Sequence, residues 1–386
     1  MKMRSMIPVL TLAMIMFIAT GTVLADLNNG LAAHYPFDGD ANDESGNGNH
    51  GTLTNMDPAT IWIAGKIGQA IDFDGINDIV LVDNDSSLEP STELTLSAWI
   101  RTPTGHWGDD NIISKDARIG SFVSNTPSNG YLLRTGFPED EILFFAGGFK
   151  PSGPDIITVE WLHVVGTYIA STRMAIFINA AQFSERTSNV PSSIPYAGGK
   201  LGIGGPFDES FGYFNGAVDD IRIYNRSLSD FEIRDLYYMG SAVKVSLDIK
   251  PQSCPNPLNV RSKGKLPVAI LGNGDFNVRD IDITTIELNG ISPIKSAFED
   301  VTAPAASIDD ECFCEVLDPD SFEDLVLKFD RQEIIESLGD VQDGQEITLS
   351  LLCKLQDGVT LIRGTDCIVI EDEEEEDDED EEFVFE

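Results

Sequence analysis

Most of this chain consists of short segments in which apolar and polar residues alternate, separated by clusters of Gly, Pro, Asn and Asp. Successive side chains of a β-strand point to opposite faces, so this period of two predicts strands, whereas helical periodicity is almost absent. Before residue 240 the predicted strands include 76–82, 94–101, 142–146, 162–168, 173–179 and 217–224. The pattern predicts an all-β fold with a first sandwich over residues 26–240.

One segment, 229–238, has the spacing of a short helix. Ser229 and Glu232 form the Ser-x-x-Glu sequence of a capping box, and Phe231, Leu236 and Tyr237 are placed to lie against the sandwich. Gly240 predicts the end of this helix and a domain boundary.

A second alternating pattern starts at residue 243, where Val243, Val245, Leu247 and Ile249 share one face. Further predicted strands are 267–271, 281–288, 325–329, 346–352 and 361–370. They predict a smaller C-terminal β-sandwich over residues 243–370. Residues 371–386 begin with twelve consecutive acids, which cannot bury a core, and predict a disordered tail.

The first 25 residues have the pattern of a cleavable export signal. Lys2 and Arg4 precede an apolar run over residues 6–18, and Ala25 ends a small-residue cleavage site. A membrane helix is the alternative, but the run is short and residues 20–22 interrupt its end. We expect a secreted protein whose mature chain begins near Asp26, with no later segment long enough to span a bilayer.

Length and charge narrow the function further. The 386 residues are 42% hydrophobic, which is enough for two cores, and the formal net charge is −40. Without the signal and the acidic run the charge is still about −30, because only twelve acids and two cations are removed. Such a field repels nucleic acid and anionic membrane surfaces and attracts divalent cations.

Asp219 is unusual within the predicted strand 217–224. Strict alternation places it on the apolar face of Ile221 and Ile223, while Asp220 lies on the other face with Arg222 and can remain in water. No Lys or Arg shares the face of Asp219. A buried carboxylate is costly unless it is paired or bound to a cation.

The glycine-rich segment 30–53 could supply the remaining ligands of such a cation. Asp38, Asp40, Asn42 and Asp43 offer hard oxygen atoms of the kind that Ca²⁺ binds, although their spacing is not that of an EF-hand. The alternative is a solvated Asx-rich turn. We predict a Ca²⁺ site that joins this segment to Asp219.

All five cysteines lie in the C-terminal half: Cys254, Cys312, Cys314, Cys353 and Cys367. In an exported protein they predict disulfides with one cysteine left over. Cys353 continues an apolar face and predicts a bridge to Cys367 across a hairpin, with Cys254 joined to Cys312 or Cys314. A zinc site is the alternative, but the four histidines, His34, His50, His106 and His163, all lie in the other half.

Five segments in a fixed order carry a resemblance: 35–53, 68–82, 94–101, 160–168 and 214–233. Through them, residues 30–240 resemble the laminin-G-like, concanavalin A-like lectin/glucanase superfamily. The resemblance implies a two-sheet jelly roll, often with Ca²⁺ between the N-terminal loop and an Asp of the penultimate strand. Asp38 and Asp219 match that pattern best, then Asp43, with Asp40 or Asn42 as alternatives.

Two other features qualify the resemblance. Asn179-Ala180 departs from the Asn-Gly turn usual in the family. Residues 243–370 resemble a β-sandwich module of exported bacterial and archaeal proteins that has no assigned chemistry. Within it, Asp318, Asp320 and Asp324 are spaced like a second calcium loop, but a surface acid cluster fits the neighbouring residues better.

The leading functional prediction is a lectin-like binding protein for a carbohydrate or another surface ligand. The loop 102–111 offers an aromatic ring and polar groups for a sugar, namely His106, Trp107, Asp109, Asp110 and Asn111. Trp107 could instead anchor the loop. Of the other tryptophans, Trp99 matches a position with a structural role in the family, and Trp161 is expected in the core.

A structural spacer without ligand is the alternative function. A glycan-cleaving enzyme is disfavoured, because such enzymes need two facing carboxylates about 5 to 10 Å apart. The Glu-x-Asp-x-x-Glu sequence of the family glucanases is absent outside the acidic tail, and no Ser-His-Asp or Cys-His set is apparent. We therefore expect a non-enzymatic protein.

Overall fold

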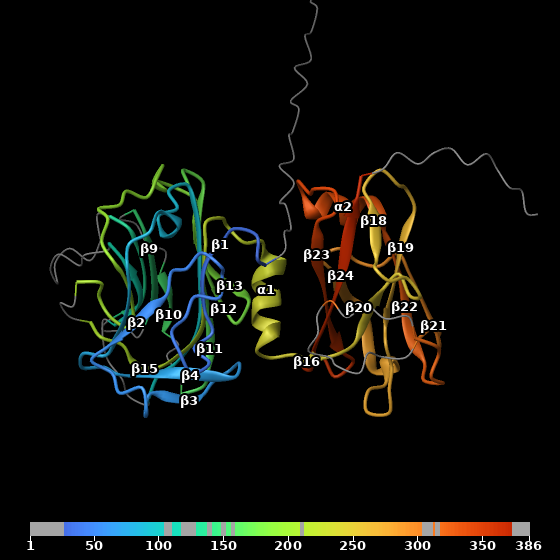
Figure 1. Cartoon of the computed structure of the whole chain (residues 1–386), viewed down its shortest axis with the longest axis horizontal. Coiled ribbons are helices and arrows are strands. Elements are labelled where there is room, and N and C mark those ends of the chain that lie inside the picture. Colours follow the sequence, from blue (N-terminus) through green and yellow to red (C-terminus); the bar gives the residue numbers. More distant parts are fainter. Residues whose placement is uncertain are drawn as a thin grey trace, which may run out of the picture.

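Two β-sandwiches lie side by side, with helix α1 (Asp230–Met239) between them (Figure 1). The computed structural model describes residues 27–103, 110–116, 129–136, 141–147, 152–155, 159–208, 212–302, 312 and 317–372. The predicted signal segment and most of the predicted acidic tail lie outside these residues. Within them, no helix is both long enough and apolar enough to cross a membrane.

The N-terminal sandwich consists of two antiparallel sheets. Sheet A contains, in spatial order, β13 (Ala181–Arg186), β12 (Arg173–Ile178), β11 (Leu162–Ile169), β6 (Glu93–Arg101), β15 (Asn215–Tyr224), β4 (Gln69–Asp74) and β3 (Trp62–Ala64), and β1 (Leu31–Tyr35) also pairs with β15. Sheet B contains β10 (Ser152–Asp155), β9 (Glu141–Ala146), β8 (Tyr131–Gly136), β7 (Asn111–Lys115), β14 (Leu201–Ile203), β5 (Ile79–Val82) and β2 (Gly51–Thr54). A short 3₁₀ helix, Ser86–Leu88, precedes β6.

The C-terminal sandwich has two smaller sheets. Sheet C contains β16 (Val243–Lys244), β24 (Leu361–Glu371), β23 (Glu346–Leu355) and β20 (Ile281–Leu288), with β18 (Pro257–Asn259) also paired to β24. Sheet D contains β17 (Leu247–Ile249), β19 (Lys265–Ile270), β22 (Asp324–Asp330) and β21 (Lys295–Glu299). A 3₁₀ helix, Val278–Asp280, and helix α2 (Arg331–Leu338) complete it. The all-β expectation is confirmed.

Each sandwich buries its own core. In β6, Leu94, Leu96, Ala98 and Ile100 face sheet B and belong to the first core. Their neighbours in sequence, including Trp99 and Arg101, therefore lie on the outer face of sheet A, because side chains alternate. A separate cluster joins α1 to that outer face through Phe177, Tyr224 and Leu236.

The capping box of α1 is present as predicted. The Ser229 side chain accepts a hydrogen bond from the backbone N–H of Glu232, and the Glu232 side chain accepts one from the backbone N–H of Ser229. Gly240 is the C-cap residue. Helix α2 was not predicted. Its N-cap is Asp330, which accepts hydrogen bonds from the backbone N–H groups of Gln332 and Glu333.

A β-bulge in β15 changes the predicted position of Asp219. The register with β6 shifts between Asp219 and Arg222, and Asp220 has a φ of 43°. Val218 before the bulge and Ile221 after it both face the core, so Asp219 lies on the opposite, outer face. The prediction that it shares the face of Ile221 is therefore wrong, because one inserted residue reverses the alternation.

The disulfide prediction is also corrected. Cys367 is bonded to Cys312, and Cys353 is a free, buried cysteine. The Cys353–Cys367 bridge is wrong, as is the Cys254–Cys312 pairing, although Cys254 is itself disulfide-bonded. In β23, Cys353 pairs with Ile362, whereas Cys367 pairs with Thr348, so the two cysteines lie at different positions along the hairpin.

Two residues assigned to the predicted disordered tail, Glu371 and Asp372, are ordered by contacts with the C-terminal sandwich. Glu371 is the last residue of β24 and pairs with Asn259 of β18. Asp372 accepts a hydrogen bond from Arg261 at 2.7 Å. Strand pairing thus includes Glu371 in the C-terminal sandwich, and an ion pair with Arg261 holds Asp372.

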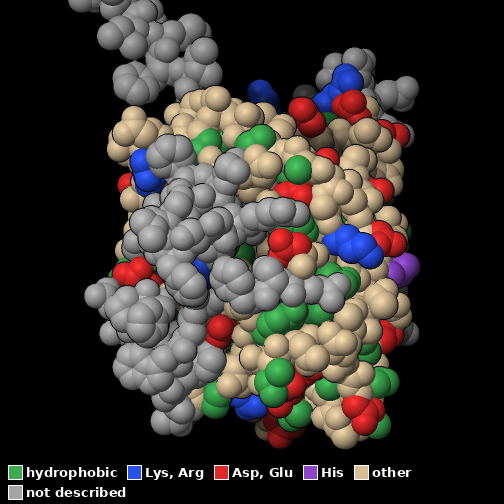
Figure 2. Space-filling model, turned by 90° about the vertical axis from the view of Figure 1, so that its left-hand side faces the viewer, with side chains coloured by type: hydrophobic (Ala, Val, Ile, Leu, Met, Phe, Trp, Pro, Cys, Tyr) green, Lys and Arg blue, Asp and Glu red, His purple; other side chains and the backbone are tan. Residues whose placement is uncertain are grey.

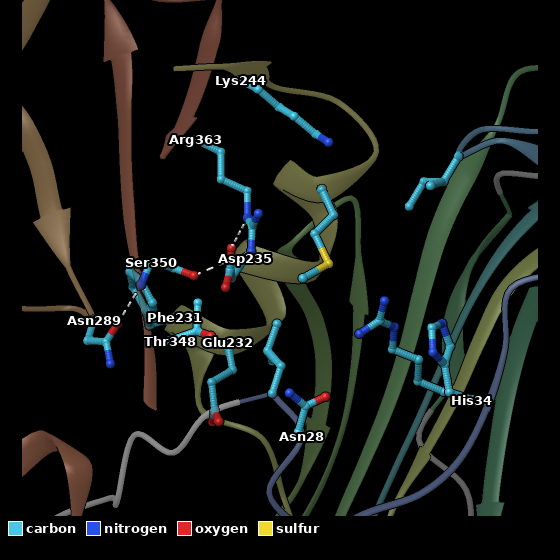
Figure 3. A pocket seen from close by; sticks show the side chains of 14 residues that line it. Asn28, His34, Phe231, Glu232, Asp235, Lys244, Asn289, Thr348, Ser350 and Arg363 are labelled. Carbon is cyan, nitrogen blue, oxygen red and sulfur yellow. Dashed lines mark hydrogen bonds and ion pairs between the residues drawn. The ribbon is translucent and has the colours of Figure 1, made fainter. Parts of the chain in front are cut away.

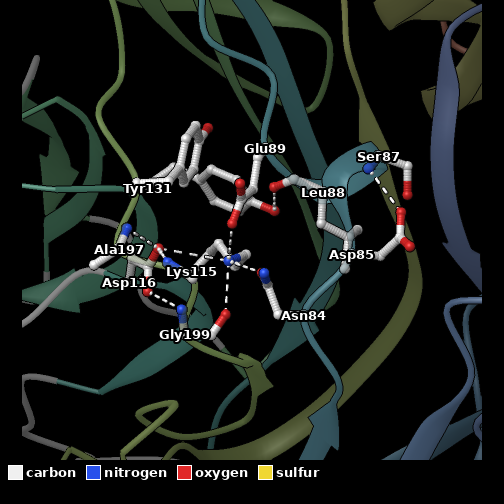
Figure 4. Close-up of polar contacts among 12 residues, drawn as sticks. Asn84, Asp85, Ser87, Leu88, Glu89, Lys115, Asp116, Tyr131, Ala197 and Gly199 are labelled. Carbon is white, nitrogen blue, oxygen red and sulfur yellow. Dashed lines mark hydrogen bonds and ion pairs between the residues drawn. The ribbon is translucent and has the colours of Figure 1, made fainter.

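A buried lysine of β7 ties together segments that connect the strands of the N-terminal sandwich (Figure 4). The Nζ atom of Lys115 donates hydrogen bonds to Asn84 Oδ1 at 2.6 Å, Gly199 O at 2.7 Å and Glu89 Oε1 at 3.2 Å. Asp116 Oδ2 lies 3.5 Å from the same ammonium group. The side chain of Lys115 is fully buried, so these oxygen atoms replace its hydration shell.

Candidate functional site

Asp219 is a buried carboxylate on the outer face of sheet A. Its Oδ2 atom accepts hydrogen bonds from the backbone N–H groups of Lys66 at 2.7 Å and Ile67 at 2.9 Å. Its Oδ1 atom is buried and has no hydrogen-bond partner. Burial raises the pKa of Asp219 to about 7, and the backbone N–H groups of Ile67, Lys66 and Asp220 only partly oppose that effect.

Asp38 contacts the same turn as Asp219. Its Oδ1 atom accepts a hydrogen bond from the backbone N–H of Gln69 at 2.6 Å. A Cβ atom added to Gly65 would lie 2.6 Å from Asp219 Oδ2, and one added to Gly68 would lie 2.2 Å from Asp38 Oδ1. The turn between β3 and β4 therefore packs against both predicted metal ligands, and it needs glycine at both places.

The other predicted metal ligands tie the N-terminal loop to itself. Asp43 accepts hydrogen bonds from the backbone N–H groups of His34, Ser45 and Asn49, each at 2.9 Å. Asp40 accepts hydrogen bonds from the backbone and the side chain of Asn42.

Because Asp43 and Asp40 already accept these hydrogen bonds, fewer of their oxygen atoms remain for a cation. Among the described residues, the one compact trio of potential metal-binding side chains is Cys312, Glu346 and Cys367, and its cysteines form the disulfide. The five predicted calcium ligands thus do not form a compact cluster. The Oδ1 atom of Asp219 has no hydrogen-bond partner and could bind a cation. Asp38 packs against the same turn and could be a second ligand. Calcium at these two residues stays a prediction.

Asp220 is buried, contrary to the prediction that it stays in water. Arg222 donates to Asp220 Oδ1 from Nη2 at 3.1 Å, and His34 Nε2 lies 2.7 Å from the same oxygen. Although burial opposes ionisation, these two groups lower the pKa of Asp220 well below its ordinary range. The predicted partnership with Arg222 is present, inside the protein.

The predicted ligand loop is described only at its ends. His106, Trp107 and Asp109 lie outside the described residues, so their role stays a prediction. Asn111 is 2% exposed, and its side-chain amide donates to the carbonyl of Gly212 at 2.8 Å. Asn111 therefore ties two segments together, and Asp110 is buried beside it. Neither is presented to a ligand as predicted.

A groove on the outer face of sheet A begins where that loop begins. We call it the rim groove; its volume is about 520 Å³, and it is lined by Asp72, Phe73, Asp74, Arg101, Thr102, Pro103, Val159, Asn215, Gly216 and Ala217. Asp72 and Arg101 are the cross-strand neighbours of Ala217 on its two sides. Ala217, which is buried, lies between these two charged groups.

Trp161 supports one wall of the rim groove. The guanidinium carbon of Arg101 lies 4.9 Å from the centre of the Trp161 ring, a cation-π contact. Trp161 is half-buried and belongs to no core cluster, so the expectation that it is a core residue is wrong. Trp99 is buried, in agreement with its expected structural position, and stacks against Tyr237 of α1 at 5.5 Å.

A second cavity lies between the two sandwiches, beside α1 (Figure 3). We call it the inter-sandwich cavity; its volume is about 330 Å³, and it is lined by Leu27, Asn28, His34, Ile67, Arg222, Phe231, Glu232, Asp235, Met239, Lys244, Asn289, Thr348, Ser350 and Arg363. Arg363 of β24 donates to Asp235 of α1 at 2.6 Å, which joins the sandwiches across a buried ion pair.

The sequence analysis predicted neither the rim groove nor the inter-sandwich cavity, although the sequence contains a signal for both. Arg222 and Arg363 each interrupt an apolar strand, as Asp219 does, and Arg101 ends one. The burial argument applied to that carboxylate applies equally to these cations. The sequence could not show which segments lie beside them, because the lining residues come from distant parts of the chain.

The possible second calcium loop in the C-terminal sandwich is not a simple surface cluster. Asp324 is fully buried and accepts hydrogen bonds from the backbone N–H groups of Gly272 at 3.0 Å and Val301 at 2.9 Å. Asp318 is exposed, and Asp320 accepts a hydrogen bond from Phe322. The preferred surface interpretation is therefore wrong for Asp324, which joins three backbone segments.

Away from α1, the N-terminal sandwich presents a face on which acidic side chains are scattered among apolar and uncharged polar ones, with few Lys and Arg side chains (Figure 2). This agrees with the excess of 65 acidic over 25 basic residues.

Comparison with known proteins identifies the N-terminal sandwich. Residues 74–234 match the sequence model of the concanavalin A-like lectin/glucanases superfamily. The comparison with curated proteins found no match. Similar solved structures include domain 4 of the extracellular arabinanase AbnA from Geobacillus stearothermophilus, solved with arabinotriose, at 22% identity over 54% of this chain and 98% of that one, with a TM-score of 0.39.

Two toxin domains are also similar. The binding domain of Paraclostridial Mosquitocidal Protein 1 is 13% identical over 85% of this chain and 84% of that one, with a TM-score of 0.43. The receptor-binding domain of botulinum neurotoxin D is 15% identical over 66% and 69%, with a TM-score of 0.41. From the family match and its two large sheets, residues 74–234 are a domain of the concanavalin A-like lectin/glucanase superfamily, followed in this chain by two smaller C-terminal sheets.

Proposed function

We propose that this protein is an exported, non-catalytic binding protein that recognises a carbohydrate in the rim groove. The observation that supports this most directly is the arrangement around Arg101, which lies over the Trp161 ring in a groove also lined by Asp72, Asp74 and Asn215. Small-ligand sites combine apolar or aromatic surface with a few fixed polar groups, and the rim groove has both.

The chemistry of the groove suits sugar hydroxyls. A guanidinium group offers N–H donors in a fixed plane, and carboxylates offer acceptors. The cation-π contact with Trp161 places the guanidinium group of Arg101 beside an aromatic ring. Gly216 has a φ of 141°, and a Cβ atom there would lie 2.3 Å from the carbonyl oxygen of Arg101. Glycine is therefore required for the close approach of β15 to β6 at this wall.

A glycan hydrolase is the second candidate, because Asp72 and Asp74 are two residues apart on one face of β4 and both line the groove. The contacts of Asp74 favour binding instead. Its Oδ1 atom accepts hydrogen bonds from the backbone N–H groups of Ile76 at 2.8 Å and Asn77 at 3.3 Å. Asp74 thus acts as the cap of the β4–β5 turn. A hydrolase would need a second carboxylate that can act together with Asp72, and Asp74 is already bonded within this turn.

Export and calcium belong to the same proposal. The Cys312–Cys367 disulfide supports an oxidising, extracellular compartment. The unpartnered Oδ1 atom of Asp219 supports a Ca²⁺ ion, with Asp38 as the second protein ligand. In this proposal calcium stiffens the β3–β4 turn and takes no part in binding the sugar.

A glycan array with the mature chain, read in Ca²⁺ and in EGTA, tests this function. We expect retention of at least one glycan class in both conditions and no release of sugar when the bound glycan is incubated with the protein. Absence of binding to every glycan would favour the spacer function. Steady release of reducing ends would favour the hydrolase.

A further inference from the structure

We propose that the rim groove selects a carbohydrate with a free amino group, whose ammonium ion lies against Asp72 while its hydroxyls face Arg101. This inference rests on the proposed function and names the class of sugar. Two features carry it. Acidic side chains line the β4 side of the groove, and the one cation among the described lining residues, Arg101, lies on the opposite side, on β6.

The β4 side of the rim groove carries negative charge without a partner cation. The Asp72 side chain makes no hydrogen bond or ion pair with the residues that the structure describes. The Asp74 carboxylate accepts hydrogen bonds from two backbone N–H groups, those of Ile76 and Asn77. The described lining therefore holds two acids and one cation, a formal charge of −1.

A third carboxylate lies behind this side of the groove. Asp78 is buried, and its Oδ2 atom accepts a hydrogen bond from the backbone N–H of Asp74 at 3.1 Å. Burial raises the pKa of Asp78, and the negative charges of Asp74 and Asp72 raise it further, against the opposing effect of that hydrogen bond. Partial burial also raises the pKa of Asp72 and outweighs the lowering effect of Arg101. The three carboxylates thus repel one another, and a bound cation would relieve that repulsion.

The order of the strands separates Arg101 from Asp72. Ala217 of β15 pairs with Asp72 on one side and with Arg101 on the other, so all three lie on the outer face of sheet A. Neighbouring strands are about 4.8 Å apart, which places the backbones of β4 and β6 about 10 Å apart. Arg101 lies over the Trp161 ring, at 4.9 Å from its centre. We expect a sugar ring to lie between the two charged groups and to contact both.

An amino sugar matches this arrangement better than a neutral or an acidic sugar does. Its ammonium group donates charge-assisted hydrogen bonds to a carboxylate, and these are stronger than the bonds that a hydroxyl donates. Its hydroxyls can accept hydrogen bonds from Arg101, whose guanidinium group has only donors. An acidic sugar would instead bring another negative charge beside Asp72 and Asp74. The volume of about 520 Å³ lies within the usual range for ligand sites, about 300 to 1,000 Å³.

Calorimetric titration of the mature chain with two sugar tetramers tests this preference. One tetramer consists of glucosamine and the other of N-acetylglucosamine with the same linkage, so only the first is charged. The titrations are run in EGTA at pH 6, where an aliphatic amine is protonated. The quantity compared is the ratio of the two dissociation constants. Tetralysine serves as a cation without a sugar.

Two matched variants separate the groove from the general charge of the chain. Asp72→Asn removes one charge from the groove and keeps the size of the side chain. The control, Asp83→Asn, makes the same change at a side chain that is 90% exposed and lies outside the groove lining. Each variant removes one of 65 acidic residues, so both change the overall charge equally.

We expect the wild type to bind the glucosamine tetramer about 10-fold more tightly than the acetylated one, because a charged hydrogen bond replaces a neutral one. Asp72→Asn should bring this ratio close to one, and Asp83→Asn should leave it unchanged. A ratio that Asp72→Asn does not change would trace the preference to the overall charge of −40 and overturn the proposal. Equally tight binding of tetralysine would overturn the assignment to a sugar.

Failure of this inference is distinguishable from failure of the proposed function. Equal affinity for the two tetramers refutes the amine preference alone. So does binding of neither tetramer while a glycan from the array is still bound and Arg101→Gln weakens that binding. Absence of binding to every glycan refutes both.

Discussion

Replacing Asp219 with Asn removes a buried charge while keeping the shape of the side chain. In the wild type, Oδ2 accepts two backbone hydrogen bonds and Oδ1 has none, and burial raises the pKa from 3.8 to about 7. An amide oxygen can keep the bonds from Lys66 and Ile67. The amide nitrogen then takes the place of the unpartnered oxygen, without a charge.

The sign of the pH effect follows from the raised pKa. Between about pH 4 and pH 7 the folded state binds more protons at Asp219 than the unfolded state does, so the stability of the wild type should fall as the pH rises through this window. The difference between 3.8 and about 7 corresponds to about 4 kcal/mol. Asp219→Asn should lose this component and should be more stable than the wild type at pH 8 in EGTA.

Urea unfolding followed by tryptophan emission measures this effect selectively. All four tryptophans, Trp62, Trp99, Trp107 and Trp161, lie before residue 240, so the signal reports the N-terminal sandwich. The matched control is Asp83→Asn, which makes the same charge change at a side chain that is 90% exposed. If Asp219→Asn keeps the wild-type pH slope in EGTA, the reasoning about its burial is refuted. If Ca²⁺ stabilises both proteins equally at pH 8, the metal assignment is refuted.

Three other substitutions test particular contacts. Lys115→Met should destabilise the N-terminal sandwich by about 3 to 5 kcal/mol, because it leaves Glu89 and Asp116 without their buried cation; unchanged urea midpoints would contradict this. Cys312→Ser should lower the stability of the C-terminal sandwich by about 4 kcal/mol, since the disulfide closes a loop of 55 residues, and peptide mapping should find Cys353 alkylated only after unfolding. Arg363→Met should leave Asp235 buried without its partner and split the calorimetric unfolding into two transitions, whereas a single wild-type-like transition would argue against coupling through α1.

Local patterns predicted much of the fold. The strands around Leu96, Val164 and Leu349 and the capping box of Ser229 depend on residues close together in sequence, so alternation and spacing were sufficient to find them. The bulge at Asp220 was not predictable in this way. One inserted residue reverses every face after it, and nothing in the alternation of 217–224 marks the insertion.

At the candidate sites, prediction from the sequence was limited by contacts between residues that lie far apart along the chain. The partner of Cys367 depends on which segments meet in space, and one sequence allows several connectivities. For the same reason the burial of Asp219 was anticipated, but its face and its contacts with the β3–β4 turn were not. The rim groove and the inter-sandwich cavity each combine residues from several distant segments, so neither could be assembled from local patterns.

The central claim, that the rim groove binds carbohydrate, is tested most directly by titrating a glycan retained on the array into Arg101→Gln. The matched control is Arg279→Gln, which makes the same change at a side chain that is 54% exposed in the C-terminal sandwich. We predict that Arg101→Gln weakens binding at least 10-fold with an unchanged melting temperature, while the control binds like the wild type. Equal affinity of Arg101→Gln and wild type would contradict the claim.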